Sequence, residues 1–167
     1  MSENREWIET GMPGIKRDPE TLLPVVVDEQ LADGLLAADD ACDKVVVLIA
    51  RGEHHAAAEL VTETRLTDPQ NMRMRMLDAD VIRASGDTER AIRRLRNLLE
   101  EFEGSGHEAM LNQYLGILQY NAGDPRAAAQ RFRSALALHT EAGALPRRIE
   151  LARRSLQAAE ERAASVR

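Results

Sequence analysis

Ala122-Gly123-Asp124-Pro125 is one of three short turn signals that decide the fold of this chain, the others being Ser85-Gly86-Asp87-Thr88 and Arg51-Gly52-Glu53-His54. The first two glycines in chain order are 34 positions apart, and the second and third are 37 positions apart. Glycine ends a helix without strain in the left-handed conformation, and an acid or a proline suits the first turn of the next helix. Each signal therefore predicts a tight bend between two antiparallel helices.

Small and apolar residues follow each bend at helical spacing. Ala57, Ala91 and Ala128 each lie five positions after a turn glycine, and further apolar residues recur at spacings of four and three. This spacing places one apolar stripe on one face of each second helix. A single helical hairpin cannot bury both of its apolar faces, so the pattern predicts that neighbouring hairpins stack.

The third copy of the pattern begins near Ala109 and contains Leu115-Gly116, followed by Ala128, Phe132 and Ala135. These residues resemble the signature of the tetratricopeptide repeat. The resemblance implies an all-α, right-handed α-solenoid of three helix-turn-helix pairs.

The three repeats are expected at about 38–71, 72–108 and 109–142. The first copy matches the family at Ala57 and at Pro69, the proline that closes a repeat. The second copy has Asp78 where the family usually has an apolar residue, which is its main departure from the pattern.

The flanking segments are predicted from their own patterns. Asp28 suits the N-cap of a helix that leads into the first repeat, and residues 146–165 are typical of a capping helix with proline in its first turn. Residues 1–27 are rich in Gly and Pro and are predicted to be irregular, with Trp7 as their only large anchor. We therefore expect an irregular segment over 1–27 and a single domain over 28–167.

Composition favours a helical, aliphatic protein. Of the 167 residues 44% are hydrophobic but only 3% are aromatic, and the single cysteine, Cys42, excludes an intrachain disulfide. The longest apolar run, residues 45–50, is far shorter than the ~20 residues of a membrane helix. Residues 1–20 lack the pattern of a signal peptide. These features predict a cytoplasmic protein without a membrane association.

The formal net charge of −6 is distributed unevenly. Residues 1–70 carry fifteen acids and six bases, whereas residues 71–167 carry thirteen acids and sixteen bases. Because the second half is only mildly basic and its arginines are mixed with acids, nucleic-acid binding is not expected.

The concave surface of such a solenoid is lined by the first helix of each pair, in the register that the family resemblance implies. The mixture of methionine, tyrosine and arginine there suits a peptide. The opposing interpretation is that the apolar members are core and that Arg83 pairs with Asp80 or Asp87. The partner-binding candidates are Arg73, Met76, Asp80, Arg83, Met110, Gln113, Ile117, Tyr120 and Asn121, with Cys42, Val46 and Ile49 from the first repeat.

Other candidate sites are weaker. Some tetratricopeptide proteins hold a chaperone's C-terminal carboxylate with lysine, arginine and asparagine. The corresponding positions here are Cys42, Val46, Leu77, Met110 and Tyr114, and none of them is a clamp residue. Four arginines stand at equivalent repeat positions and form either a binding surface for an acidic partner or a solvent-exposed face. They are Arg94, Arg96, Arg131 and Arg133.

No catalytic, metal or cofactor site is expected. The adjacent residues His54 and His55 cannot share a helix face, and no third ligand has a useful spacing from them. Cys42 has no histidine at a motif spacing, and the chain has no phosphate-binding glycine loop.

The sequence therefore predicts a non-catalytic module that binds a protein or peptide segment in its concave groove. Substitution of Tyr120 and Arg83 by Ala is expected to weaken that binding without unfolding. The alternative is a self-associating structural module or homo-oligomer, in which the acidic half of one chain meets the arginine-rich half of another. A variant is that the segment around Trp7 occupies its own groove.

Overall fold

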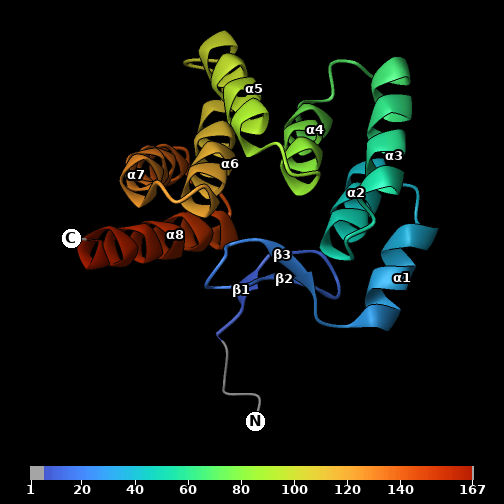
Figure 1. Cartoon of the computed structure of the whole chain (residues 1–167), viewed down its shortest axis with the longest axis horizontal. Helices are drawn as coiled ribbons and strands as arrows, with labels where there is room; N and C mark the ends of the chain where they lie inside the picture. The colour runs from blue at the N-terminus through green and yellow to red at the C-terminus, as the bar shows by residue number, and fades with distance from the viewer. Residues whose placement is uncertain (1–5, 167) are drawn as a thin grey trace.

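A computed structural model describes residues 6–166 and is mostly helical (Figure 1). The all-α expectation is correct for most of the chain. The helices run in an arc, with a small sheet on the inner side of the arc (Figure 1). The helices are α1 (Glu29–Ala37), α2 (Ala41–Ala50), α3 (His54–Thr67), α4 (Met72–Ala84), α5 (Thr88–Glu101), α6 (Glu108–Asn121), α7 (Pro125–Glu141) and α8 (Pro146–Ser165).

The three turn glycines lie where the sequence predicted them, directly after α2, α4 and α6. Gly52, Gly86 and Gly123 have φ values of +76°, +101° and +85°. The residue after each glycine donates its backbone N–H to a carbonyl five residues back, as in Glu53 N to Leu48 O at 2.8 Å. This is the Schellman arrangement, which satisfies the last carbonyls of a helix. The predicted bends are therefore confirmed.

The predicted apolar stripes are buried between successive helices. Ala91 and Leu95 of α5, like Ala128 and Phe132 of α7, have no solvent-exposed surface. Helices joined by a glycine turn pack against each other, as do α3 with α4 and α5 with α6. The packing is tight at Gly116 of α6, where a Cβ atom would lie 2.5 Å from Cε1 of Phe132. The core is aliphatic, as the composition predicted.

The helices at the two ends of the chain also follow the sequence. Asp28 accepts a hydrogen bond from the backbone N–H of Leu31 at 3.0 Å and caps α1. Helix α1 ends at Ala37, and the side chain of Asp40 caps the N-terminus of the next helix. Helices α1 and α2 are therefore separate. Helix α8 begins at Pro146 and is the last helix within residues 6–166.

The prediction of an irregular segment over residues 1–27 was wrong for its described part. This segment forms a three-stranded antiparallel sheet in the order β1 (Ile8–Glu9), β2 (Ile15–Arg17) and β3 (Pro24–Val26). Ile8, Ile15 and Leu22 are almost completely buried, so Trp7 is not its only anchor. Strands of two or three residues are too short to show the alternation that identifies a strand in a sequence.

The sheet packs against helices from both ends of the arc. Strand β3 contacts α2, and β1 contacts α8. Ile15 belongs to the apolar core around α2, α3 and α4, whereas Ile8 and Leu22 belong to the core formed with α6, α7 and α8. The sheet therefore joins α2 near one end of the arc to α8 at the other end, across the inner side of the arc.

Candidate ligand-binding site

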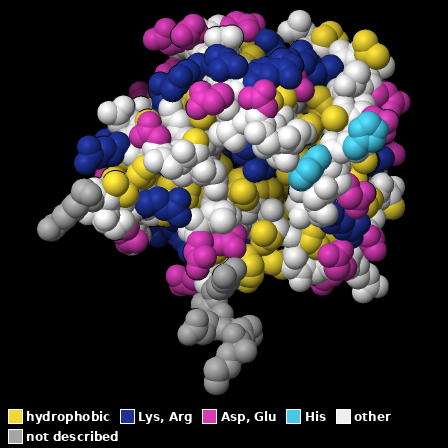
Figure 2. All heavy atoms as spheres, in the orientation of Figure 1, with side chains coloured by type: hydrophobic (Ala, Val, Ile, Leu, Met, Phe, Trp, Pro, Cys, Tyr) yellow, Lys and Arg dark blue, Asp and Glu magenta, His cyan; other side chains and the backbone are white. Residues whose placement is uncertain are grey.

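A cavity of about 350 Å³ lies between the sheet and the helices. Hydrophobic side chains are visible at the centre of this face, between the sheet and the helices (Figure 2). Its walls come from the sheet, from α2, α4 and α6, and from the region where α7 passes into α8. The cavity is lined by several of the predicted groove residues and also by Thr10, Met12, Arg17, Val46, Leu77, Tyr114, His139, Arg147, Arg148 and Leu151.

Side chains of α6 and α8 hold the sheet in place by binding its backbone. Asn121 donates to the carbonyl of Thr21 at 2.8 Å. Arg154 donates to the carbonyl of Glu6 at 2.6 Å. Each of these bonds is worth roughly 0.5–3 kcal/mol, the higher values applying to the charged donor. The wall that the sheet contributes is thus fixed to the helices by specific polar contacts as well as by apolar packing.

Five of the nine partner-binding candidates line this cavity: Arg73, Asp80, Met110, Gln113 and Ile117. Two of them are already paired. Arg73 forms an ion pair with Asp43 at 2.6 Å, and Asp80 accepts from Arg83 Nε at 2.6 Å. Burial by itself would lower the pKa of Arg73, but the hydrogen bond and charge of Asp43 outweigh it and raise the pKa.

The other four candidates do not line the cavity. Met76 is buried in the apolar core formed with α5 and α6. Tyr120 is only 3% exposed and lies beneath Arg162, whose guanidinium carbon is 3.8 Å from the ring centre. Arg83 holds Asp80, and Asn121 binds the sheet. Because Tyr120 and Arg83 are structural, replacing them by Ala would disturb the fold and would not isolate binding.

The candidates of the first repeat divide in the same way. Val46 lines the cavity, whereas Cys42 and Ile49 are buried in the adjoining core. Burial raises the pKa of the Cys42 thiol, which disfavours the thiolate form that a nucleophile requires.

Sequence reasoning missed three sources of cavity residues. Met12 and Arg17 come from the sheet, which was not predicted, and Tyr114 was considered only as a clamp position. Arg147 and Arg148 stand at the start of α8, where the arginine-rich pattern suggested only a cap. Their position directly after Pro146 was the one signal available, since it places them in the first turn of a helix that follows the last pair.

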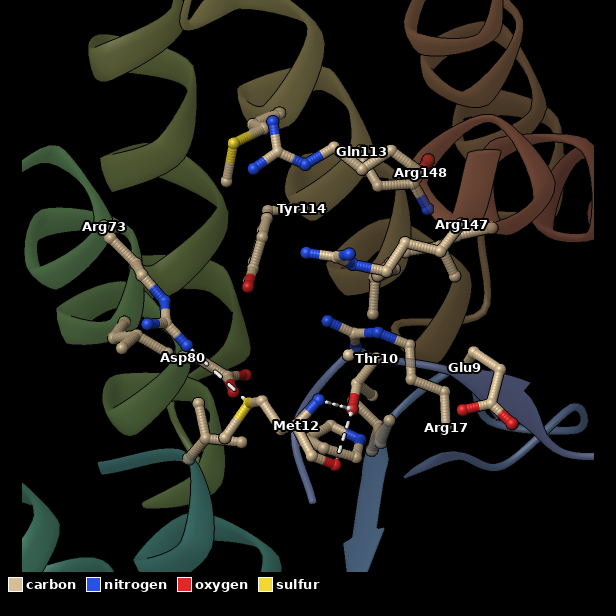
Figure 3. A pocket seen from close by; sticks show the side chains of 18 of the residues that line it. Glu9, Thr10, Met12, Arg17, Arg73, Asp80, Gln113, Tyr114, Arg147 and Arg148 are labelled. Atoms are coloured by element: carbon tan, nitrogen blue, oxygen red, sulfur yellow. Dashed lines mark hydrogen bonds between the residues drawn. The ribbon is translucent and has the colours of Figure 1, made fainter. Parts of the chain in front are cut away.

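Arg147 lies directly on the turn between β1 and β2. Gly11 in this turn has φ +79°, and a Cβ there would lie 2.7 Å from Nε of Arg147. A side chain at position 11 would therefore meet both backbone strain and the arginine. The guanidinium groups of Arg17 and Arg147 and the hydroxyl of Tyr114 point into the space between the sheet and the helices (Figure 3).

His139 is a buried residue of the cavity wall, and its protonation opposes folding. Burial, together with the positive charge of Arg148, lowers the pKa of His139 below its ordinary value of 6.5. In the acidic window just below 6.5 the unfolded chain binds this proton and the folded chain does not. The free energy of unfolding should therefore fall as the pH is lowered through this window, with a slope of at most about 1.4 kcal/mol per pH unit.

Urea denaturation between pH 7.5 and 5.5 measures this slope. His139→Gln should reduce it, while His55→Gln, at a side chain 91% exposed, should leave it unchanged. An identical slope in the wild type and in His139→Gln would show that His139 does not control stability in this pH range.

Two of the four arginines at equivalent repeat positions form ion pairs. Arg94 pairs with Asp78 at 2.7 Å, and Arg133 pairs with Glu160 at 3.1 Å. Arg96 and Arg131 line a shallow depression on the side of α5 and α7. Lys and Arg side chains also gather at the end of the molecule where α5 lies (Figure 2).

Residues 6–166 contain no cluster of three or more potential metal-ligating side chains. No helix in this range has the length and apolar content needed to cross a bilayer. Comparisons with family models, curated proteins and solved structures find no match for this chain.

Proposed function

We propose that this protein is a non-catalytic binding module that takes a short peptide or protein segment on the inner side of its helical arc. The observation that carries the proposal is the cavity of about 350 Å³ into which side chains of the sheet and of five helices converge. Binding sites are usually concave and mostly apolar, with a few polar groups placed to fix orientation. Apolar side chains of α2, α4 and α6, such as Val46, Leu77 and Ile117, supply part of these walls, and polar or charged side chains supply the rest.

We further propose that the helix pairs form a right-handed solenoid of the tetratricopeptide type. The Schellman turns after α2, α4 and α6 support this, because they recur at intervals of 34 and 37 residues with the same hydrogen-bond pattern. The close contact of Gly116 with Phe132 supports it as well, since both residues match the family signature.

The sheet limits what the inner surface accepts. It already covers Tyr120 and the end of α6, so only the remaining cavity is open to a partner. A space of this size accommodates a few side chains of an extended segment. A longer segment would have to displace the sheet, and would lose the burial of Ile8 and Leu22, each worth ~1.5–3 kcal/mol.

Tyr114 is the best residue for testing the proposal. It is half-buried, its ring faces the cavity, and the Arg17 guanidinium carbon lies 5.8 Å from its centre. Aromatic side chains at the centre of an interface commonly contribute more than about 1 kcal/mol to binding. A peptide selected from a random library on the full chain should therefore bind Tyr114→Ala about tenfold more weakly.

Leu66→Ala is the matched control, because Leu66 is 80% exposed on α3 and does not line the cavity. Isothermal titration calorimetry of the wild type and both variants gives the comparison. Selected peptides that bind Tyr114→Ala and Leu66→Ala equally well would overturn the proposal. Light scattering of the unliganded protein at low and high salt tests the alternative of self-association.

A further inference from the structure

Three arginines reach the cavity from two distant parts of the chain. Arg17 ends strand β2, and Arg147 and Arg148 open helix α8. Figure 3 shows them on one side of the cavity, above the turn between β1 and β2. The packing of Arg147 on Gly11 and the hydrogen bond from Arg17 Nη1 to the carbonyl of Leu22 at 2.9 Å fix two of the three at the cavity wall.

The acids around the cavity do not neutralise these arginines, because each is bound to another cation. Asp43 pairs with Arg73 at 2.6 Å and Asp80 with Arg83 at 2.6 Å. Glu9 pairs with Lys16 at 2.8 Å.

Among residues 6–166, no carboxylate lies within ion-pair distance of Arg17, Arg147 or Arg148. The cavity therefore carries three positive charges beyond those that its own acids balance.

Like charges in a partly enclosed space repel one another more strongly than they do in open water. The pKa of His139 in the cavity wall is lowered first by burial and second by the positive charge of Arg148, and the second cause is of the same kind. An anion that contacts the guanidinium groups removes the repulsion and forms charge-assisted, often bidentate hydrogen bonds. Leu77, Met110 and Ile117 of α4 and α6 offer apolar contact to the rest of such a ligand, beside Arg73 and Asp80, whose charges are already paired.

We infer that the cavity binds a small organic molecule that carries a doubly charged oxyanion, a phosphomonoester or a dicarboxylate, on an apolar body. The oxyanion contacts Arg17, Arg147 and Arg148, and the apolar body lies against α4 and α6. A volume of about 350 Å³ is at the small end of the range for ligand sites, which fits a small molecule. Binding of this molecule requires no protein partner.

Such a ligand also connects the sheet to α8. Arg17 belongs to the sheet, and Arg147 and Arg148 belong to the helix against which β1 packs. A bound anion therefore stabilises the docked sheet, and any segment that enters the same cavity competes with the anion. Small-molecule binding and segment binding are thus expected to oppose each other.

Calorimetric titration of the full chain tests the inference. The probes are phenyl phosphate, benzylsuccinate, inorganic phosphate and benzyl alcohol at pH 7.5. At least one of the two organic dianions should bind with a Kd below about 1 mM and at least tenfold more tightly than inorganic phosphate or benzyl alcohol. The tighter of the two identifies the oxyanion as a phosphate or a dicarboxylate.

The decisive comparison is between two double variants of equal charge. Arg147→Gln/Arg148→Gln should weaken binding of the preferred dianion at least tenfold. Arg93→Gln/Arg126→Gln should change it less than twofold, because these two arginines are exposed like Arg147 and Arg148 but do not line the cavity. Thermal unfolding of each variant checks that the fold is retained, and Arg17→Gln provides an independent third test from the sheet.

The inference is overturned if neither organic dianion binds, if inorganic phosphate binds as tightly as both, or if the two double variants weaken binding equally. These titrations contain no peptide. Their failure therefore leaves the peptide comparison with Tyr114→Ala unaffected, and a failed peptide comparison leaves the dianion result standing.

Discussion

Replacing Phe132 by Ala should lower the free energy of unfolding by about 3–5 kcal/mol, the usual range for removing a buried aromatic ring. Phe132 lies on α7 and has no exposed surface. Among residues 6–166 it is the largest fully buried side chain. Its ring packs on Gly116 of α6, so closely that a Cβ atom at this position would clash with it. Urea denaturation followed by far-ultraviolet circular dichroism measures the loss.

Gly116→Ala should also destabilise the protein, by about 1–3 kcal/mol, because the new Cβ would lie 2.5 Å from Cε1 of Phe132 and 2.7 Å from Cδ1. The two changes should not be additive. Once the ring is gone, the methyl group introduced at position 116 has room, so the double variant should be more stable than the sum of the single effects predicts.

Gly34→Ala is the matched control, since a Cβ atom at this position on α1 would have no other atom within 4 Å. It should leave stability unchanged or raise it slightly, because Ala is a better helix former than Gly. Strict additivity of Gly116→Ala and Phe132→Ala would contradict the close packing of α6 on α7.

Replacing Asp78 by Ala should have the second largest effect, a loss of about 2–3 kcal/mol. Asp78 on α4 accepts a hydrogen bond from Arg65 of α3 at 2.6 Å and pairs with Arg94 of α5 at 2.7 Å. Its side chain is only 17% exposed, so its removal leaves two half-buried guanidinium groups facing each other without an anion. The departure from the repeat pattern at this position thus has a structural reason: one carboxylate joins three successive helices.

Glu160→Ala is the control for Asp78→Ala. It breaks the Arg133–Glu160 pair, whose side chains are 60% and 53% exposed, and such pairs contribute about 0–1 kcal/mol.

The triple change Arg65→Met, Asp78→Leu and Arg94→Met should recover most of the stability, because apolar residues can replace a buried ion-pair cluster. If Asp78→Ala proves no more destabilising than Glu160→Ala, the bridge does not stabilise the stack.

The helices could be predicted from the sequence because their signals are long and redundant. Each of the bends at Gly52, Gly86 and Gly123 is marked by a glycine, by an acid that follows it and by a spaced apolar stripe. These local signals act over ten or more residues, so errors at single positions do not remove them. The sheet lacks such redundancy, because its three strands are two or three residues long and its glycines and prolines are typical of loops.

The candidate site was only partly predictable for the same reason. The helical positions Arg73, Asp80, Met110, Gln113 and Ile117 follow from a regular repeat and do line the cavity. The family register alone cannot show that Tyr120 is covered, because the cover is Arg162 of α8 and the sheet beneath it.

Arg17, Arg147 and Arg148 meet only through tertiary structure, since about 130 residues separate the first from the other two. No local pattern in a single sequence reports contacts at such a separation. The positive charge of the cavity therefore depends on the tertiary structure and could not be predicted from the sequence.

The central claim is that ligands bind in the cavity between the sheet and the arc of helices. Hydrogen–deuterium exchange of the full chain with and without a selected peptide measures this directly. The account predicts slower exchange of backbone amides in β2, in α6 around Tyr114 and at the start of α8. Slower exchange confined to the outer helices α3, α5 and α7, with those three segments unchanged, would contradict it.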